Sequence, residues 1–406
     1  MRQVEGSAAL PGGTAGTAGT AGPRVDRPVS GRALVISGSV GAGHDRAAAE
    51  LTARLRERGL HVDQQDFLLA FPRPLRFLLR ACYVGSANYA PWALGWMFAS
   101  IEAFGVMYSL SMWMCALARR PVEQWLKPGY DVVVSTYPWA SQTVGELRAG
   151  GRLDHPAVTF LTDPAAHLLW VHPEVDHHLT VTQATADQGA RDYGVEMEVG
   201  GPLVSGRFWH LTQRAERLRA RAAIRTQLGL PEDALVALIL TGSLGIGDVE
   251  GTVDAVLASG AAVPVVACGR NEVLRRRLAV RLGPRALGWR DDVPDLMAAS
   301  DVLVTNAGGL SFTEALVSGL PAISFAALPG HGEANARVLD AAGLAPWART
   351  TAQLTDALNA TAADQARLSA PRGRVDEIVA RLACSPTSAA PTVTSPPSLG
   401  PLHGGF

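Results

Sequence analysis

The sequence predicts an α/β protein built from two doubly wound domains. Its 406 residues are enough to form two separate cores. In each half, short apolar runs that suit buried parallel strands are followed by glycine-rich turns and amphipathic helices. This succession of strand, glycine turn, helix and strand is typical of a sheet with helices on both faces.

The composition narrows the function classes. Apolar residues make up 48% and charged residues 18%, which indicates a globular protein. The net charge of −1 gives no overall attraction to nucleic acid, so no nucleic-acid partner is expected. The four cysteines have no CxxC spacing, and we interpret them as reduced core thiols of a cytoplasmic protein.

Both ends of the chain differ in composition from the centre. Residues 1–30 contain the repeat GTAGTAGTAG and no apolar signal-peptide core, and residues 384–406 are rich in serine and proline. We predict two disordered tails here. The first domain is then expected over residues 31–208 and the second over residues 209–383.

The first domain opens with a strand at 33–37, a glycine loop, and a helix that ends near Gly59. The loop contains Gly41 and Gly43 and is followed directly by His44. Such a loop alone is shared by many nucleotide-binding proteins. Asp66 follows the next strand, so the sequence pattern also leaves a dinucleotide site open.

Residues 67–126 do not follow the alternation of strands and helices seen in the rest of the chain. The stretch 92–117 is almost entirely apolar, but a single crossing there would put strands 33–37 and 132–135 on opposite sides of a bilayer. We therefore expect no spanning helix. A cationic stripe beside an apolar face favours contact with anionic lipid headgroups, although a solvated arginine face above a core fits the same pattern. The stripe and its neighbouring tryptophans are Arg73, Arg76, Arg80, Trp92 and Trp96.

The α/β order returns with strands at 132–135, 156–161 and 179–181. Thr162 and Asp163 follow the second of these, which places Asp163 at the carboxyl edge of the sheet, where ligands bind. Five histidines lie between His155 and His178 without metal-ligand spacing, so no metal site is predicted.

The second domain contains two glycine loops that suit an anion. One loop spans residues 242–247 after the strand at 234–240, and the other includes Gly308 and Gly309 after the strand at 302–304. Free backbone N–H groups and the dipole of the following helix favour negative charge there. Glu314 lies in the first turn of that helix, where it either caps the helix or accepts hydrogen bonds from ligand hydroxyls.

These motifs, in this order, resemble the family of monogalactosyldiacylglycerol synthases and processive diacylglycerol glycosyltransferases. They are more distantly similar to the N-acetylglucosaminyltransferase of peptidoglycan synthesis. The resemblance covers roughly residues 31–345. It implies a GT-B fold, in which two Rossmann-like domains face each other across a cleft. It also implies a UDP-hexose donor, a lipid acceptor such as diacylglycerol, and no metal or other cofactor. The implied location is cytoplasmic, peripheral on the inner face of the cell membrane.

The resemblance assigns roles to individual residues. His44 is the expected catalytic base, with Asp163 as the alternative, and Gly41 and Gly43 are expected to approach the acceptor. The residues expected to bind the donor are Gly242, Ser243, Gly245, Arg270, Trp289, Val293, Gly308, Gly309, Ser311, Thr313, Glu314, His331 and Asn335.

One motif departs from the family. The family commonly has Pro-Gly-Gln-Glu where this chain has Pro329-Gly330-His331-Gly332, so the residue that meets the sugar differs. Two other function classes stay open on the sequence. They are a sugar-nucleotide epimerase of the same fold and a catalytically impaired, membrane-associated UDP-sugar binder.

Overall fold

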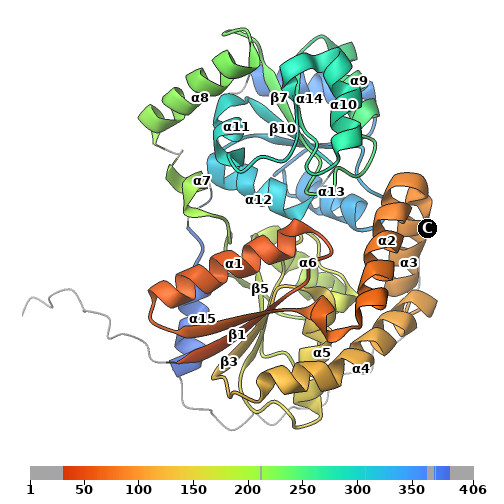
Figure 1. The fold of residues 1–406 in the computed structure, drawn as a ribbon, viewed down its shortest axis with the longest axis vertical. Coiled ribbons are helices and arrows are strands. Elements are labelled where there is room, and N and C mark those ends of the chain that lie inside the picture. The colour runs from red at the N-terminus through yellow and green to blue at the C-terminus, as the bar shows by residue number, and fades with distance from the viewer. Residues whose placement is uncertain (1–30, 211–212, 307, 364–369, 371, 385–406) are drawn as a thin grey trace, which may run out of the picture.

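The computed structural model describes residues 31–210, 213–306, 308–363, 370 and 372–384. These residues form two parallel six-stranded sheets, one in each half of the molecule (Figure 1). The strand orders are β2-β1-β3-β4-β5-β6 and β12-β11-β10-β7-β8-β9. In each sheet the order reverses beside the first strand of that half, β1 or β7, and ligands of doubly wound folds bind at such points. The predicted α/β class is confirmed.

The first sheet has helices on both faces because successive side chains of a strand point to opposite sides. Ala33 and Val35 of β1 pack against α1 and α15, whereas Leu34 and Ile36 pack against α4 and α5. The elements are β1 (Arg32–Ser37), α1 (Ala42–Glu57), β2 (His61–Asp66), β3 (Val132–Ser135), α5 (Pro138–Ala149), β4 (Ala157–Phe160), β5 (His177–Thr180), α6 (Gln183–Tyr193) and β6 (Glu198–Val199), with 3₁₀ turns at Phe67–Ala70 and Leu168–Trp170.

The second sheet repeats this arrangement. Leu238 of β7 packs towards α8, α11 and α12, and Ile239 packs towards α9, α10 and α14. The elements are α7 (Gly206–His210), α8 (Arg214–Leu228), β7 (Val236–Leu240), α9 (Val249–Ser259), β8 (Val263–Ala267), α10 (Glu272–Leu282), a 3₁₀ turn (Gly283–Arg285), β9 (Ala286–Leu287), α11 (Val293–Ala299), β10 (Val302–Thr305), α12 (Gly309–Ser318), β11 (Ala322–Phe325), α13 (His331–Ala341), β12 (Trp347–Ala348) and α14 (Thr351–Ala363).

Three helices are inserted between β2 and β3: α2 (Arg73–Tyr89), α3 (Pro91–Glu102) and α4 (Val106–Leu126). They lie along one side of the molecule and reach from the first domain to the second (Figure 1). The buried face of α4, with Met114, Ala118 and Val122, completes the core of the first domain. Leu94 of α3 packs with Ile246 and Leu328 of the second domain.

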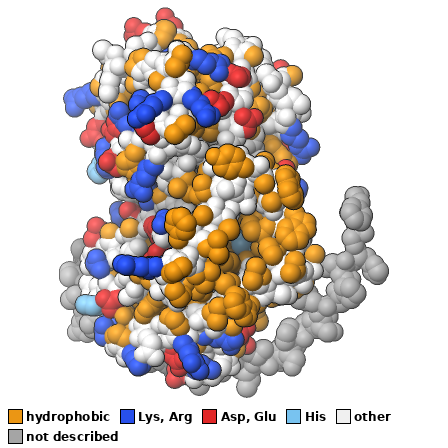
Figure 2. All heavy atoms as spheres, turned by 45° about the vertical axis from the view of Figure 1, so that its right-hand side comes forward, with side chains coloured by type: hydrophobic (Ala, Val, Ile, Leu, Met, Phe, Trp, Pro, Cys, Tyr) orange, Lys and Arg blue, Asp and Glu red, His pale blue; other side chains and the backbone are white. Residues whose placement is uncertain are grey.

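The outer face of these helices carries a large apolar surface (Figure 2). Eleven of the sixteen exposed large apolar side chains in the described residues lie within residues 69–117, so the surface is concentrated on this insertion. We call these eleven side chains the apolar patch. They are Leu69, Phe77, Leu78, Tyr89, Trp92, Trp96, Phe104, Val106, Leu110, Trp113 and Leu117.

No single helix in the described part of the chain has both the length and the hydropathy needed to cross a bilayer. The pair α3 and α4 meets that test together, but the two helices are bent by 77° at their junction. Glu102 ends α3 at this bend. Its carboxylate accepts hydrogen bonds from the Leu168 backbone N–H at 3.0 Å and from the Tyr193 hydroxyl at 2.8 Å.

The last helix, α15 (Val375–Cys384), corrects the predicted domain boundary. The sequence analysis assigned residues up to 383 to the second domain, but α15 packs on the first sheet through Val375, Ile378 and Val379. Arg58, the residue that follows α1, forms an ion pair with Asp376 of α15 at 2.5 Å. An amphipathic helix fits either sheet, so its own pattern does not indicate which one it covers. We predicted tails at 1–30 and 384–406; Cys384 instead ends α15, and residues 1–30 and 385–406 lie outside the described residues.

The cysteine prediction is half wrong. Cys115 and Cys268 are buried, as expected for core thiols, but Cys82 and Cys384 are exposed. Cys82 belongs to α2, where Phe77 and Leu78 are also exposed, so an apolar neighbourhood in sequence does not mean a buried position here.

Candidate functional site

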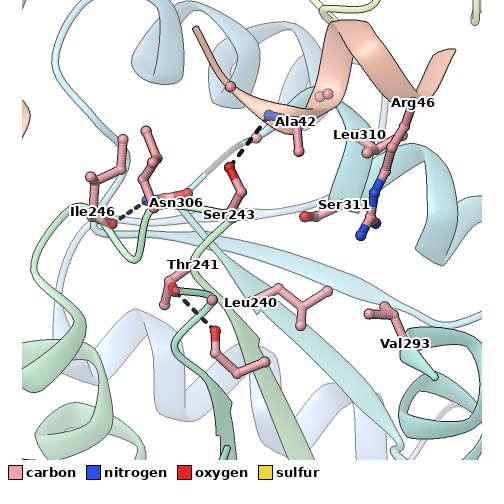
Figure 3. A pocket seen from close by; sticks show the side chains of 18 of the residues that line it. Ala42, Arg46, Leu240, Thr241, Ser243, Ile246, Val293, Asn306, Leu310 and Ser311 are labelled. Atoms are coloured by element: carbon pink, nitrogen blue, oxygen red, sulfur yellow. Dashed lines mark hydrogen bonds between the residues drawn. The ribbon is translucent and has the colours of Figure 1, made fainter. Parts of the chain in front are cut away.

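A cavity of about 220 Å³ lies between the carboxyl edges of the two sheets. Its walls come from the loop before α1, the loops after β7 and β10, and residues at the starts of α11 and α13 (Figure 3). The structure therefore brings together eleven of the residues predicted from sequence. They are Gly41, Gly43, Gly242, Ser243, Trp289, Val293, Gly308, Gly309, Ser311, Glu314 and His331.

The two glycine loops of opposite domains touch at this cavity. The Ala42 backbone N–H donates to the Ser243 hydroxyl at 3.4 Å, which joins the first turn of α1 to the loop after β7 (Figure 3). Gly245 does not line the cavity and instead packs against the backbone of Cys268. Asn271 braces the same loop through a hydrogen bond from its amide to the Gly245 carbonyl at 3.2 Å. The loop is therefore held in place before any ligand binds.

The first turn of α12 forms the other anion-binding wall. Its first backbone N–H groups have no partner within the helix, and the helix dipole adds positive potential. Gly308 and Ser311 line the cavity, whereas Thr313 is buried and donates back to the Gly309 carbonyl at 2.9 Å. Thr313 thus faces the helix rather than the cavity.

Gly309 is required by the contact between the domains. A Cβ atom at this position would overlap the Thr162 carbonyl oxygen and lie 3.2 Å from the Asp163 Cα. The start of α12 therefore rests directly on the loop that follows β4.

Gly309→Ala is expected to lower the free energy of unfolding by about 1–3 kcal/mol, because the added methyl has no space. Gly308→Ala is the matched control, since nothing lies within 4 Å of a Cβ there. Thermal and urea unfolding of both variants measure the difference. Equal stability of the Gly309 variant and the wild type would contradict the observed domain contact.

Glu314 is buried at the cavity wall, with only 4% of its side chain exposed. Its Oε1 lies 3.3 Å from Nη1 of Arg46, which reaches across from the first domain. Burial raises the pKa of Glu314 from 4.5 to about 7, and the nearby Arg46 partly opposes that rise. The carboxyl group is therefore poised between its two protonation states near neutral pH.

This raised pKa predicts a pH-dependent stability. The folded protein holds the Glu314 proton more tightly than the unfolded chain does. The contribution of Glu314 to the free energy of unfolding is therefore fully present below pH 4.5 and is lost as the pH rises to about 7. Glu314→Gln removes the titration, so the variant should gain up to about 3 kcal/mol over the wild type between pH 4.5 and 8. Urea unfolding at several pH values measures this gain, and a stability difference that does not change with pH would contradict it.

Two guanidinium groups lie close to the ring of Trp289. The Cζ atom of Arg270 is 4.5 Å from the indole centroid, and that of Arg46 is 5.3 Å from it. The ring is 37% exposed and lines the cavity together with Val293. Arg270 does not line the cavity itself, so its contact with the site runs through Trp289.

His44 lies in the first turn of α1, behind the cavity wall. Its Nδ1 is 2.8 Å from the Thr136 carbonyl oxygen and 2.9 Å from the Thr162 hydroxyl. Because a carbonyl can only accept, Nδ1 carries a proton, and Nε2 is the nitrogen that holds the lone pair in the neutral ring. The rings of Tyr137 and Trp170 pack against the imidazole at 5.3 and 5.9 Å. This tautomer is the one that a general base requires.

Asp163, His167 and His331 form a second cluster of titratable side chains near His44. The Asp163 Oδ2 accepts a hydrogen bond from the Trp170 indole N–H at 3.2 Å. Burial lowers the pKa of His167 to about 4 and also lowers the pKa of His331. Phe98 of α3 packs over both imidazoles, with centroids 5.8 Å and 5.0 Å away. Two neutral imidazoles from opposite domains thus meet under one phenyl ring.

Asn335 has a different place from the predicted one. It is buried, and its Oδ1 accepts a hydrogen bond from the Ala165 backbone N–H at 2.9 Å. This bond ties α13 of the second domain to the loop after β4 of the first. Asn335 therefore supports the cleft rather than lining the cavity.

The predicted lipid-facing residues lie away from the cavity, on the inserted helices. Trp92 and Trp96 of α3 are exposed, as are Arg73 and Arg80 of α2, and Arg76 is half-buried. None of these arginines forms an ion pair with another described residue.

The cavity is also lined by residues that the sequence analysis did not assign to the site, among them Arg46, Tyr83 and Asn306. Burial raises the pKa of Tyr83 to about 12, so its hydroxyl stays protonated. The Asn306 amide donates to the Ile246 carbonyl at 3.1 Å and joins the two loops of the second domain (Figure 3). Arg46 follows Ala42 by about one helical turn, and this spacing is the one signal in the sequence that places Arg46 on the cleft side of α1.

Two doubly wound domains with a cavity between their carboxyl edges define the GT-B fold, and comparison with solved structures supports that class. The glycosyltransferase of kitacinnamycin matches with a TM-score of 0.52 at 17% identity, over 88% of this chain and 94% of that one. The spinosyn rhamnosyltransferase SpnG matches with a TM-score of 0.51 at 16% identity, over 87% of this chain and 95% of that one.

The family comparison is more specific. Residues 44–199 match the model of the monogalactosyldiacylglycerol (MGDG) synthase family. The chain is 25% identical over 358 residues to the processive diacylglycerol beta-glucosyltransferase of Bacillus cereus, covering 83% of this chain and 87% of that protein. The protein of the same name from Bacillus pumilus is 27% identical to this chain over 225 residues, covering 53% of this chain and 56% of that protein. The predicted resemblance is confirmed, and the protein is a glycosyltransferase of the GT-B fold.

Proposed function

We propose that this protein transfers a hexose from a UDP-sugar to the hydroxyl group of diacylglycerol at a membrane surface. The observation that carries the proposal is the cavity, where two anion-binding loops and the buried Glu314 converge beside His44. The relatives named diacylglycerol glucosyltransferases support a lipid acceptor.

The donor fits the second-domain side of this cavity. The loop 242–247 and the first turn of α12 offer backbone N–H groups to the diphosphate. Glu314 then accepts hydrogen bonds from the two ribose hydroxyls, and Trp289 with Val293 borders the base. His331 lines the cavity at the start of α13, and we assign it to the sugar hydroxyls in place of the family's glutamine.

The reaction is a single displacement. His44 Nε2 takes the proton of the acceptor hydroxyl, whose oxygen forms a bond to the anomeric carbon. The bond from that carbon to the β-phosphate oxygen breaks, and UDP leaves with the electron pair. The preorganised N–H donors and the α12 dipole stabilise the negative charge that develops on the departing UDP. We therefore propose that no added metal or other cofactor is needed, and that chelation with EDTA leaves turnover unchanged.

An assay with defined lipids tests the function. The purified protein is incubated with UDP-glucose or UDP-galactose, with and without diacylglycerol in phospholipid vesicles, and the products are identified by mass spectrometry. We expect UDP release that depends on diacylglycerol and yields a glycosyl-diacylglycerol. Epimerised UDP-sugar without lipid product would favour the epimerase, and binding without turnover on any lipid would favour the impaired binder.

We further propose that the apolar patch holds the protein peripherally on the inner face of the cell membrane. Trp92 and Trp96 are 73% and 54% exposed, and the cationic stripe of α2 lies beside them. Tryptophan rings favour the headgroup region, and arginines favour anionic lipid.

The double substitution Trp92→Ala/Trp96→Ala is expected to weaken binding to anionic vesicles by about tenfold or more, because two large apolar surfaces no longer leave water. Vesicle sedimentation measures the binding. The control is Leu257→Ala/Val280→Ala, which removes exposed apolar side chains from the second domain. An equal loss in both variants would contradict a role for the patch.

Salt and detergent separate the electrostatic from the apolar contribution to membrane binding. High salt should release part of the protein because it screens the arginine stripe, and detergent should release the rest. Retention in the membrane after alkaline carbonate washing would show that the bent pair α3–α4 spans the bilayer.

A further inference from the structure

Arg46 occupies the place that the nucleoside needs in the proposed function. It pairs with Glu314 and lies over Trp289, the two residues that border the ribose and the base in the proposed function. Only 4% of the Glu314 side chain is exposed, so a guanidinium group and a pair of ribose hydroxyls must approach through the same opening. A bound nucleotide therefore displaces Arg46 from Glu314.

The displaced guanidinium stays near the diphosphate loops. Ala42, one helical turn before Arg46, is hydrogen-bonded to Ser243 of the loop after β7. Gly43 lies against Leu310 of α12, so the first turn of α1 is anchored to both anion-binding walls. Figure 3 shows the Arg46 side chain reaching from α1 into the cavity beside Ser311. The side chain is 38% exposed, which leaves it room to turn.

The charges of the cavity favour this movement. The other arginine of the described lining, Arg290, is tied to Asp292 through two hydrogen bonds. When ribose hydroxyls replace Arg46 at Glu314, the Arg46 charge loses its partner just as the negative diphosphate arrives. A planar guanidinium group suits the oxygens of a phosphate, to which it donates two parallel hydrogen bonds.

We propose that Arg46 is a catalytic arginine with two positions, paired with Glu314 as in this structure and bound to the diphosphate when the UDP-sugar is present. This inference rests on the proposed function and adds a residue of the acceptor domain to the donor site. As the bond between the anomeric carbon and the phosphate oxygen breaks, the electron pair stays on that oxygen. Arg46 N–H groups then stabilise its charge, while the acceptor proton goes to His44.

Removal of Arg46 should therefore change nucleoside and nucleotide binding in opposite directions. Calorimetry compares uridine, which has no phosphate, with UDP on the wild type and on Arg46→Ala. We expect uridine to bind about two- to fivefold more tightly, because Glu314 is no longer occupied. We expect UDP to bind about 10- to 100-fold more weakly, and turnover on vesicles with diacylglycerol to fall about 10²–10³-fold.

Two further variants, a conservative substitution and a matched control, accompany Arg46→Ala. Arg46→Lys keeps the charge without the forked geometry and should retain more UDP affinity and turnover than Arg46→Ala. Arg191→Ala removes an exposed arginine of α6 that pairs with its neighbour Asp192, and should change none of these quantities. Thermal unfolding checks that each variant is folded.

The outcomes separate this inference from the proposed function. If the wild type binds UDP and glycosylates diacylglycerol but Arg46→Ala changes uridine and UDP affinity by the same factor, the inference fails alone. Tighter UDP binding with unchanged turnover would also overturn it, because Arg46 would then only obstruct the site. If the wild type binds no UDP, the proposed function and this inference fail together.

Discussion

His44→Ala should reduce turnover by about 10²–10⁴-fold, the usual contribution of a general base. Hydrogen bonds to the Thr136 carbonyl and the Thr162 hydroxyl hold its Nδ1, which leaves Nε2 to accept the acceptor's proton. The UDP affinity should stay within a few fold of the wild type, because His44 makes none of the proposed contacts with the nucleotide. Initial rates with UDP-sugar and diacylglycerol vesicles measure the first effect, and calorimetry with UDP measures the second.

Two variants sharpen this test. His61→Ala removes an exposed histidine at the start of β2 and should leave turnover unchanged. Asp163→Asn tests the alternative base, whose Oδ2 already accepts a hydrogen bond from Trp170. If His44→Ala keeps turnover within a few fold while Asp163→Asn loses it, Asp163 is the base and His44 is a structural residue.

Glu314→Ala should abolish measurable UDP binding while the protein stays folded. A buried carboxylate that accepts two ribose hydroxyls makes charge-assisted hydrogen bonds worth about 1.5–3 kcal/mol each. Their loss corresponds to a decrease in affinity of about 10²–10⁴-fold. Calorimetry with UDP measures the affinity, and circular dichroism checks the fold.

The matched control for this variant is Glu250→Ala, an exposed glutamate in the first turn of α9. It should leave the UDP affinity unchanged. Unchanged UDP affinity in Glu314→Ala itself would mean that the nucleotide binds elsewhere, and the assignment of the donor to this cavity would be wrong.

The strand predicted at 132–135 matches β3 to the residue. Those predicted at 33–37 and 302–304 differ from β1 and β10 by only one residue at one end, because each is a short buried run between turn-forming residues. Strand boundaries were less well predicted at the start of β7 and at β5, where the polar pair His177–His178 begins the strand. The glycine loops were also predicted, since their backbone requirements are local.

The inserted helices show where such local signals end. The stretch 92–117 is one nearly continuous apolar run in the sequence, but the chain breaks at Phe104–Gly105, and α3 and α4 meet there at a sharp angle. Phe104 has a positive φ of 53°, a conformation that its own residue type does not indicate. Which of these apolar side chains face the core and which face outwards depends on the packing of α4 against α5.

The sequence by itself determined the α/β class, the positions of the glycine loops and the candidate residues at strand ends, because these depend on backbone sterics and on the period of apolar residues. Only the tertiary structure decided that α15 covers the first sheet, that Asn335 binds Ala165, and that Arg46 meets Glu314. Each of these is a contact between segments far apart in the chain. Such contacts depend on which faces of separately formed elements meet, and no local pattern of residues encodes that choice.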